Sequence, residues 1–120
     1  MKIQKFEDLI AWQKAQDLAV AIYQNFSQNK DFSFKDQICR ATVSISNNIA
    51  EGFDRNSKKE FVRFLYIAKA SCSEVKSMLY LAKRLNYSNQ GILESLIQNS
   101  DEISRILRGL INSLSPQDNV

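Results

Sequence analysis

The chain has 120 residues, of which 44% are hydrophobic and 24% are charged, and its formal net charge is +3. This composition is typical of a soluble globular protein, and the length allows one hydrophobic core without metals or disulfides. Histidine is absent, which excludes imidazole bases, zinc sites that use histidine and the Glu-x-x-His pairs of di-iron bundles. The three glycines are too scattered to form a phosphate-binding loop. We therefore expect a protein that is not an enzyme and needs no cofactor.

The chain carries the signals of one domain. We expect residues 1–115 to form it and residues 116–120, which begin at the single proline, to be a disordered tail. Cys39 and Cys72 form no Cys-x-x-Cys pair, so free thiols in a reducing compartment are expected. The start of the chain lacks the apolar run of a signal peptide, and no stretch approaches the roughly 20 apolar residues of a membrane span. The expectation is a cytoplasmic protein without membrane contact.

The first predicted helix runs from about Asp8 to about Phe26. Its apolar residues recur at helical spacing and share one broad arc, whereas polar residues fall opposite, as in an amphipathic helix. The residues of this arc are Trp12, Ala15, Leu18, Ala19, Ile22, Tyr23 and Phe26. A polar stretch, residues 27–31, then ends the pattern.

The second predicted helix begins at a capping box formed by Ser33 and Asp36. It should end near Gly52, because glycine suits a left-handed C-terminal cap. One stripe of this helix is apolar and consists of Phe34, Ile38, Ala41 and Ile45.

Another capping box, Ser57-Lys58-Lys59-Glu60, begins the longest predicted helix, which extends to about Leu85 and is ended by Asn86. Its inward face comprises Phe61, Phe64, Leu65, Ala68, Cys72, Val75, Met78, Leu79 and Ala82. Ser88 is expected to cap the last helix, whose apolar face comprises Leu93, Leu96, Ile97, Ile103, Leu107, Leu110 and Leu114. Four helices with short connections predict an all-α fold, an antiparallel up-and-down four-helix bundle.

One side of the second predicted helix is polar and has apolar flanks on both sides. At 3.6 residues per turn, six hydrogen-bonding side chains fall within about 80°: Gln37, Arg40, Ser44, Asn47, Asn48 and Glu51. Arg40 and Glu51 are about 16 Å apart along the axis, so each needs a partner on another helix or subunit, and Glu74 is the candidate for Arg40. The set is either a binding or catalytic constellation or a polar seam that fixes helix register and subunit contacts. We favour the seam, enclosed between the bundle and a neighbouring chain.

The basic residues are concentrated in one segment. Residues 55–84 carry eight basic and two acidic side chains, a net charge of +6, and the remaining residues have a net charge of −3. Basic residues with interleaved tyrosines can contact phosphates while the rings stack on bases, but they can also anchor a protein interface. The alternative without a binding role is a solvated, lysine-rich helix face. The candidate nucleic-acid-binding residues are Arg55, Lys58, Lys59, Arg63, Tyr66, Lys69, Lys76, Tyr80 and Lys83.

Carboxylates offer one route to catalysis. Glu51, Asp54, Glu60 and Glu74 would have to gather around Mg²⁺, as in a nuclease site. Two of them have simpler roles, because Glu60 closes a capping box and Asp54 lies in a turn. We therefore expect no metal site and no catalytic residue.

Three groups of residues resemble one protein family. The opening matches in Phe6-Glu7-Asp8-Leu9, Trp12-Gln13-Lys14-Ala15 and Tyr23. The most specific group comprises Gln37, Arg40-Ala41, Ser44-Ile45 and Asn48-Ile49-Ala50-Glu51-Gly52. The third comprises Arg55, Ser57, Glu60-Phe61, Phe64-Leu65, Ile67-Ala68, Ser71 and Glu74. From residue 6 to about residue 114 the chain thus resembles the four-helix bundle proteins named for the 23S rRNA intervening sequence, which include the accessory variability proteins of diversity-generating retroelements.

This resemblance implies a left-handed antiparallel bundle, commonly assembled as a homopentamer with a central channel. Members are encoded inside insertions of the large ribosomal RNA gene or stand free, and the retroelement members bind nucleic acid and the reverse transcriptase through basic surfaces. We therefore expect a bacterial homopentamer that binds RNA or DNA; the alternative is a scaffold or accessory partner of a reverse transcriptase. Ser27 replaces the family's usual proline, which affects loop shape, and Ala70 replaces its usual glycine, which affects how closely helices approach.

Overall fold

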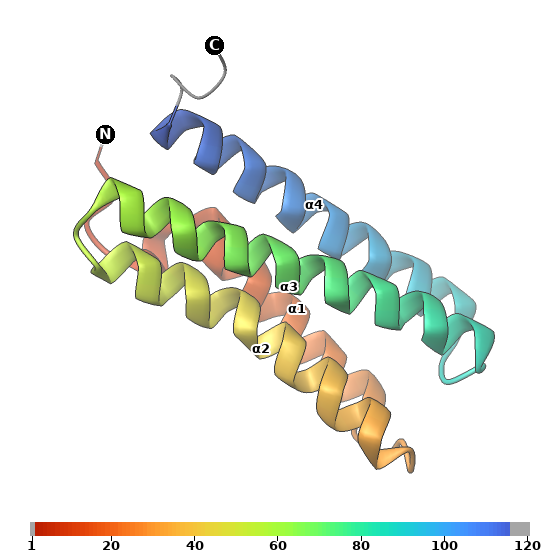
Figure 1. The fold of residues 1–120 in the computed structure, drawn as a ribbon. Helices are drawn as coiled ribbons and strands as arrows, with labels where there is room; N and C mark the ends of the chain where they lie inside the picture. The colour runs from red at the N-terminus through yellow and green to blue at the C-terminus, as the bar shows by residue number, and fades with distance from the viewer. Residues whose placement is uncertain (1, 116–120) are drawn as a thin grey trace.

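The computed structural model describes residues 2–115, and the tail predicted at residues 116–120 lies outside this range. A short 3-10 turn, η1 (Phe6–Asp8), precedes four helices, and residues 2–115 contain no strand. The helices are α1 (Ile10–Phe26), α2 (Phe32–Asp54), α3 (Lys58–Arg84) and α4 (Gln90–Leu114). Consecutive helices run antiparallel, and α4 returns beside α1, which closes the bundle (Figure 1). The predicted all-α four-helix bundle is confirmed.

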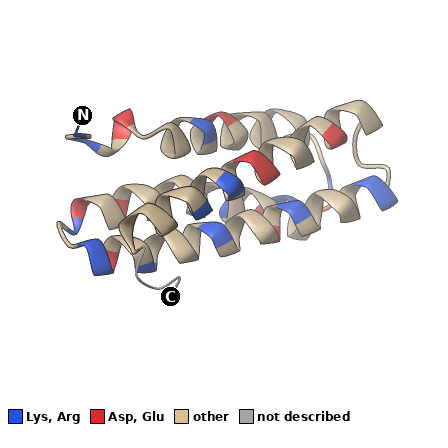
Figure 2. Cartoon of the chain, turned by 90° about the horizontal axis from the view of Figure 1, so that it is seen from above, with Lys and Arg blue, Asp and Glu red and all other residues tan. Residues whose placement is uncertain are grey.

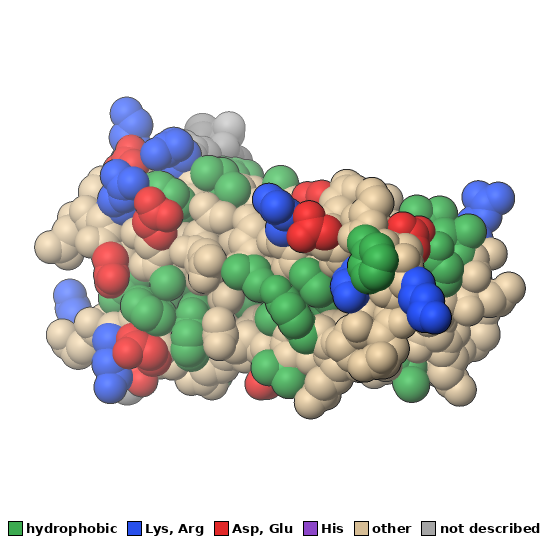
Figure 3. Space-filling model, turned by 90° about the horizontal axis from the view of Figure 1, so that it is seen from below, with side chains coloured by type: hydrophobic (Ala, Val, Ile, Leu, Met, Phe, Trp, Pro, Cys, Tyr) green, Lys and Arg blue, Asp and Glu red, His purple; other side chains and the backbone are tan. Residues whose placement is uncertain are grey.

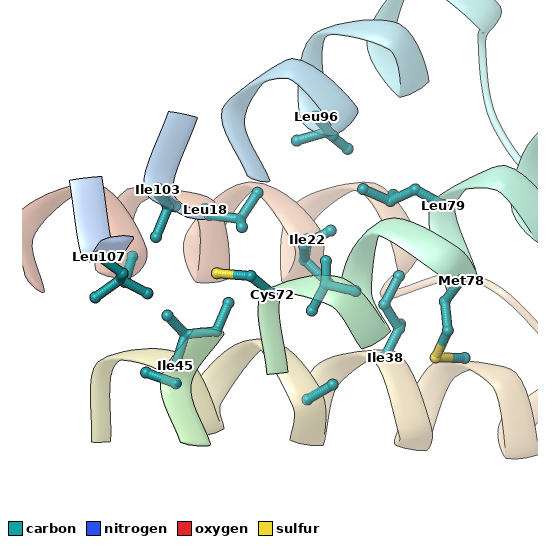
Figure 4. Packing of buried hydrophobic residues seen from close by; sticks show 14 of the residues in the cluster. Leu18, Ile22, Ile38, Ile45, Cys72, Met78, Leu79, Leu96, Ile103 and Leu107 are labelled. Carbon is teal, nitrogen blue, oxygen red and sulfur yellow. The ribbon is translucent and has the colours of Figure 1, made fainter. Parts of the chain in front are cut away.

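The core is built from the apolar stripes of all four helices. Leu18 and Ile22 of α1 meet Ile38 and Ile45 of α2 in the interior, where Leu79, Leu107 and further aliphatic residues of α3 and α4 complete the packing (Figure 4). The predicted inward face of α3 is buried throughout. Because the apolar residues are confined to such stripes, no helix within residues 2–115 is long and apolar enough to cross a bilayer.

Two predicted N-caps are wrong by one or two residues. The Asp31 side chain, not that of Ser33, accepts the hydrogen bond from the Phe34 N–H at 3.1 Å. Likewise Asn89, not Ser88, accepts from the Ile92 N–H at 3.2 Å. The Ser57 cap of α3 is confirmed, with its hydroxyl accepting from the Glu60 N–H at 3.3 Å. Helices α2, α3 and α4 thus each begin after a residue whose side chain accepts from a free N–H of the first turn.

Gly52 does not cap α2, because the helix continues through it to Asp54. The left-handed residue in this connection is Asn56, with φ of 62°. Gly52 is buried against α3, and a Cβ there would lie 2.5 Å from the Cβ of Phe64. Glycine is therefore required for close helix approach and not for chain reversal. Asn86, with φ of 57°, follows the end of α3 as predicted.

Candidate functional site

Two ion pairs set the register between α3 and α4. Lys76 Nζ lies 2.8 Å from Asp101 Oδ1, and Lys83 pairs with Glu94 one heptad further toward the α3–α4 connection. The hydrogen bond from Lys76 to Asp101, supported by the attraction between their charges, raises the pKa of Lys76. Because the helices are antiparallel, the same register two turns in the other direction places Lys69 opposite Arg108.

A hollow of about 400 Å³ follows this line between the two helices, and we call it the α3–α4 groove. It is lined by Cys72, Ser73, Lys76, Ser100, Asp101, Ser104, Arg105 and Arg108. Short side chains leave the hollow open, while three cations and one carboxylate give it a positive charge. Arg105, Arg108 and the neighbouring Lys69 form no ion pair within residues 2–115. The groove therefore combines free cations with hydroxyl groups, the donors that bind phosphate oxygens.

The predicted basic face is not uniform along α3. Basic residues recur along α3, and in α4 the acidic residues Glu94, Asp101 and Glu102 precede the basic residues Arg105 and Arg108; Figure 2 marks the basic and acidic positions on the ribbon. Lys76 and Lys83 are thus paired with carboxylates, and Lys58 and Lys59 are exposed without an ion pair in the described chain. The excess of positive charge is centred near Lys69, toward the N-terminal half of α3.

The guanidinium groups at the start of α3 belong to a local network. Arg55 pairs with Glu51 at 3.1 Å and approaches Glu60 at 3.9 Å, and Arg63 pairs with Glu60 at 3.2 Å. Both guanidinium groups also lie 4.9 Å from the ring centre of Phe64. These two candidate residues therefore have partners that account for their positions without a ligand.

Tyr66 and Tyr80 are 57% and 48% exposed. Helical geometry places both on the outward side of α3, in the same strip as Lys69 and Lys76. The ring of Tyr80 also lies 5.8 Å from Lys83 Nζ. The predicted tyrosines are therefore exposed on the strip of α3 that carries Lys69 and Lys76, and neither of them lines the α3–α4 groove.

Part of the polar stripe of α2 is a seam within one chain. The Ser44 hydroxyl lies 2.9 Å from that of Ser71 on α3, and Asn48 donates to Ser44 Oγ at 2.9 Å. Gln37 reaches Glu74 at 3.5 Å. The Ser44–Ser71 bond connects α2 to α3 through neutral groups, Gln37 adds a longer bond to the Glu74 carboxylate, and Asn48 holds the Ser44 hydroxyl in place, so these residues help to fix helix register.

The charged residues of this stripe have partners other than those predicted. Arg40 pairs with Asp36 at 2.9 Å, so the pairing of Arg40 with Glu74 is wrong. Within the described chain Glu51 pairs with Arg55, one turn further along. Side chains four residues apart meet on one helix face, which makes these local partners closer than any on α3. Arg40, Asn47 and Glu51 are exposed in the single chain.

One of the predicted apolar flanks of the α2 polar stripe, the one that includes Cys39 and Val43, forms an exposed surface with Tyr23 of α1. Two adjoining hollows, of about 680 and 370 Å³, both include Tyr23. Phe32 and Cys39 line the larger and Val43 lines the smaller. Phe32 is 69% exposed, and hydrophobic side chains interrupt the polar surface on this side of the molecule (Figure 3). We call Tyr23, Phe32, Cys39 and Val43 the α1–α2 apolar surface.

Metal-ligating groups and thiols were the remaining candidates for reactive side chains. Within residues 2–115 no group of three or more His, Cys, Asp or Glu residues is placed to hold a metal ion. Burial raises the pKa of Cys72 to about 12, and burial also raises the pKa of Cys39. Both thiols therefore stay protonated near neutral pH, which makes them poor nucleophiles.

Arg105 and Arg108 are the site residues that the sequence reasoning missed. Both lie in the last predicted helix, outside the basic segment 55–84, where Asp101 and Glu102 mask their charge in any average. Their spacing of three residues places both arginines on one face of α4. This spacing is the sequence feature that could have identified them as site residues.

Residues 7–109 match the family of 23S rRNA-intervening sequence proteins. A solved structure of a protein of unknown function from the S23 ribosomal protein family of Bacteroides thetaiotaomicron is 30% identical. The match covers 85% of this chain and 98% of that chain, with a TM-score of 0.80. No curated protein matches the sequence.

Proposed function

The chain belongs to the 23S rRNA-intervening sequence protein family, and we propose that it is a non-enzymatic, self-associating protein that binds nucleic acid along the α3–α4 groove. The charge of the groove is the observation that carries this proposal. Lys76, Arg105 and Arg108 line it, Lys69 lies opposite Arg108, and Asp101 is the one carboxylate among the lining residues.

The side chains of this groove are suited to binding phosphate groups. Guanidinium groups can form two parallel hydrogen bonds to a phosphate, and serine hydroxyls add neutral donors at short range. Arg105 and Arg108 supply the first and Ser73 and Ser104 the second. Since a phosphate backbone repeats its charge, a row of cations along a groove binds it better than one isolated ion.

Charge reversal in the groove tests the proposal. Arg105→Glu with Arg108→Glu should lower affinity for an RNA or DNA oligonucleotide at least tenfold at low salt, and reduce the slope of log affinity against log salt by about one for each cation removed. Lys30→Glu with Lys35→Glu is the control, because it makes the same change in net charge around the α1–α2 connection. Fluorescence anisotropy titrations at several salt concentrations measure the affinity and the salt slope of both variants. Equal losses in the two variants, or no binding by the parent protein at micromolar concentration, would refute the proposal.

Self-association is supported by surfaces that the single chain leaves uncovered. The α1–α2 apolar surface is open, and Arg40, Asn47 and Glu51 are exposed beside it. Together with the 23S-family resemblance, this supports a homopentamer in which a neighbouring chain covers α2. Sedimentation equilibrium gives the number of chains, and a species with the mass of one chain would exclude the assembly.

The alternative is that the basic face contacts an acidic protein surface, with a reverse transcriptase as the candidate supplied by the family resemblance. Exposed tyrosines flanked by lysines suit either partner. A reverse-transcriptase gene beside this one, together with loss of co-purification in the Arg105→Glu, Arg108→Glu variant, would favour the protein partner. A location inside an rRNA gene would favour nucleic acid alone.

A further inference from the structure

Two tyrosines of α3 have no structural role that the described chain reveals. Neither the Tyr66 nor the Tyr80 hydroxyl forms a hydrogen bond within residues 2–115, and about half of each side chain is exposed. Tyr87 provides the contrast, because its hydroxyl donates to Asp31 and its ring packs 5.1 Å from that of Phe34. Tyr80 has only the contact with Lys83 described above, and aromatic rings exposed in this way are available to stack on a ligand.

The two rings bracket the most basic part of the groove. Tyr66 and Tyr80 are fourteen residues apart, or about 21 Å along the helix axis. Lys69 and Lys76 lie between them on the same outward strip, and the arginines of α4 face this interval from across the groove. Beyond Tyr80, Lys83 pairs with Glu94, and Arg84 is exposed without an ion pair within residues 2–115.

From this arrangement we infer that the groove binds a single strand of RNA or DNA, with phosphates on Lys69 and the two arginines of α4 and with bases stacked on Tyr66 and Tyr80. The inference rests on the proposed function and specifies its ligand. A channel with a floor of serine and cysteine side chains accommodates one backbone, and a strand with unpaired bases can turn them onto exposed rings. A duplex keeps its bases paired and stacked inside, so its phosphates can reach the cations but its bases cannot reach the tyrosines.

Anisotropy titration with single-stranded oligonucleotides of about 12 nucleotides, and with the matching duplexes, tests the inference. Ribose and deoxyribose versions of each show which sugar is preferred. We expect the single strand to bind at least tenfold more tightly than the duplex at equal salt. Tyr66→Leu with Tyr80→Leu should weaken single-strand binding more than tenfold, leaving duplex binding and the salt dependence unchanged. Tyr66→Phe with Tyr80→Phe is the matched control and should bind as the parent does, because the rings remain.

The outcomes separate this inference from the proposed function. Equal affinity for single strand and duplex, with no effect of the leucine changes, would overturn the single-strand site and leave phosphate binding in the groove intact. Loss of single-strand binding in the phenylalanine variant would overturn stacking, since the hydroxyl and not the ring would be responsible. Failure of every oligonucleotide to bind would overturn the proposed function and this inference together. Thermal melting confirms that each variant is folded, as expected for changes at exposed positions.

Discussion

The two faces of α3 that contact other helices differ in the kind of polar side chain at the contact. Toward α2, short neutral side chains bond to one another, as Ser44 does with Ser71, and Gly52 lets the helices approach closely. Toward α4, long charged side chains dominate, and only some of the cations have a carboxylate partner. Both contacts lie on the same helix, so the difference comes from side chains and not from backbone geometry.

The contrast distinguishes polar side chains that stabilise the fold from charged side chains that can bind a ligand. A neutral seam whose donors and acceptors satisfy one another is complete in the free chain, and it specifies helix register. In the α3–α4 groove the cations outnumber the carboxylates. The resulting positive potential attracts an external anion. We therefore expect changes in the α2–α3 contact to alter stability, and changes in the α3–α4 groove to alter binding.

The largest effect on stability should come from Gly52→Ala. The new Cβ would lie 2.5 Å from the Cβ of Phe64, so the helices must separate. Overpacking of this kind costs about 3 kcal/mol, which exceeds the roughly 1 kcal/mol that alanine gains in helix propensity. A net loss of about 2 kcal/mol in the free energy of unfolding is expected from urea titration.

Gly109→Ala is the control for this prediction. Gly109 lies within α4 and has no atom within 4 Å of an added Cβ, so the change should stabilise the protein by about 0.5–1 kcal/mol. Opposite signs at the two glycines would show that close packing, and not helix propensity, dictates Gly52. A stabilising effect at both would mean that α2 and α3 do not touch there.

The sequence predicted the helices and their buried faces because apolar side chains repeat with the helical period. It did not predict the caps correctly, since Asp31 and Ser33 are both capable caps and lie two residues apart. Gly52 was assigned to a cap for a similar reason: its conformational freedom is visible in the sequence, but the closeness of Phe64 is a property of the packed pair.

The candidate site was predictable only in part. Lys69, Lys76 and the tyrosines were found because they share one helix, where spacing determines direction. The contribution of Arg105 and Arg108 depends on which helix lies beside α3 and in what register, and Asp101 and Glu94 determine that register. The periodic sequence pattern of one helix does not show which residues of another helix will form ion pairs with it.

An intermediate effect is expected for the hydrogen bond between Ser44 and Ser71. In a double-mutant cycle with Ser44→Ala and Ser71→Ala, the coupling energy should be about 1 kcal/mol, the usual net value of a neutral hydrogen bond. Urea titration of the four proteins measures it. Ser113→Ala, whose exposed hydroxyl bonds only to the backbone of its own helix, paired with Ser71→Ala should show no coupling. A coupling energy near zero for Ser44 and Ser71 would contradict their role as a seam.

The smallest effect should come from the pH dependence of the Lys76–Asp101 pair. Folding raises the pKa of Lys76, so the pair contributes stability below the unfolded value of about 10.4, and this contribution is lost as pH rises through the folded pKa. Lys76→Gln should therefore be slightly less stable than the parent near neutral pH, and the difference should disappear in strong alkali. In an Asp101→Asn background the same substitution should show no such trend in urea titrations across pH. A difference that stayed constant with pH would mean that the lysine stem, packed along the groove, stabilises the contact and that its charge is free for phosphate.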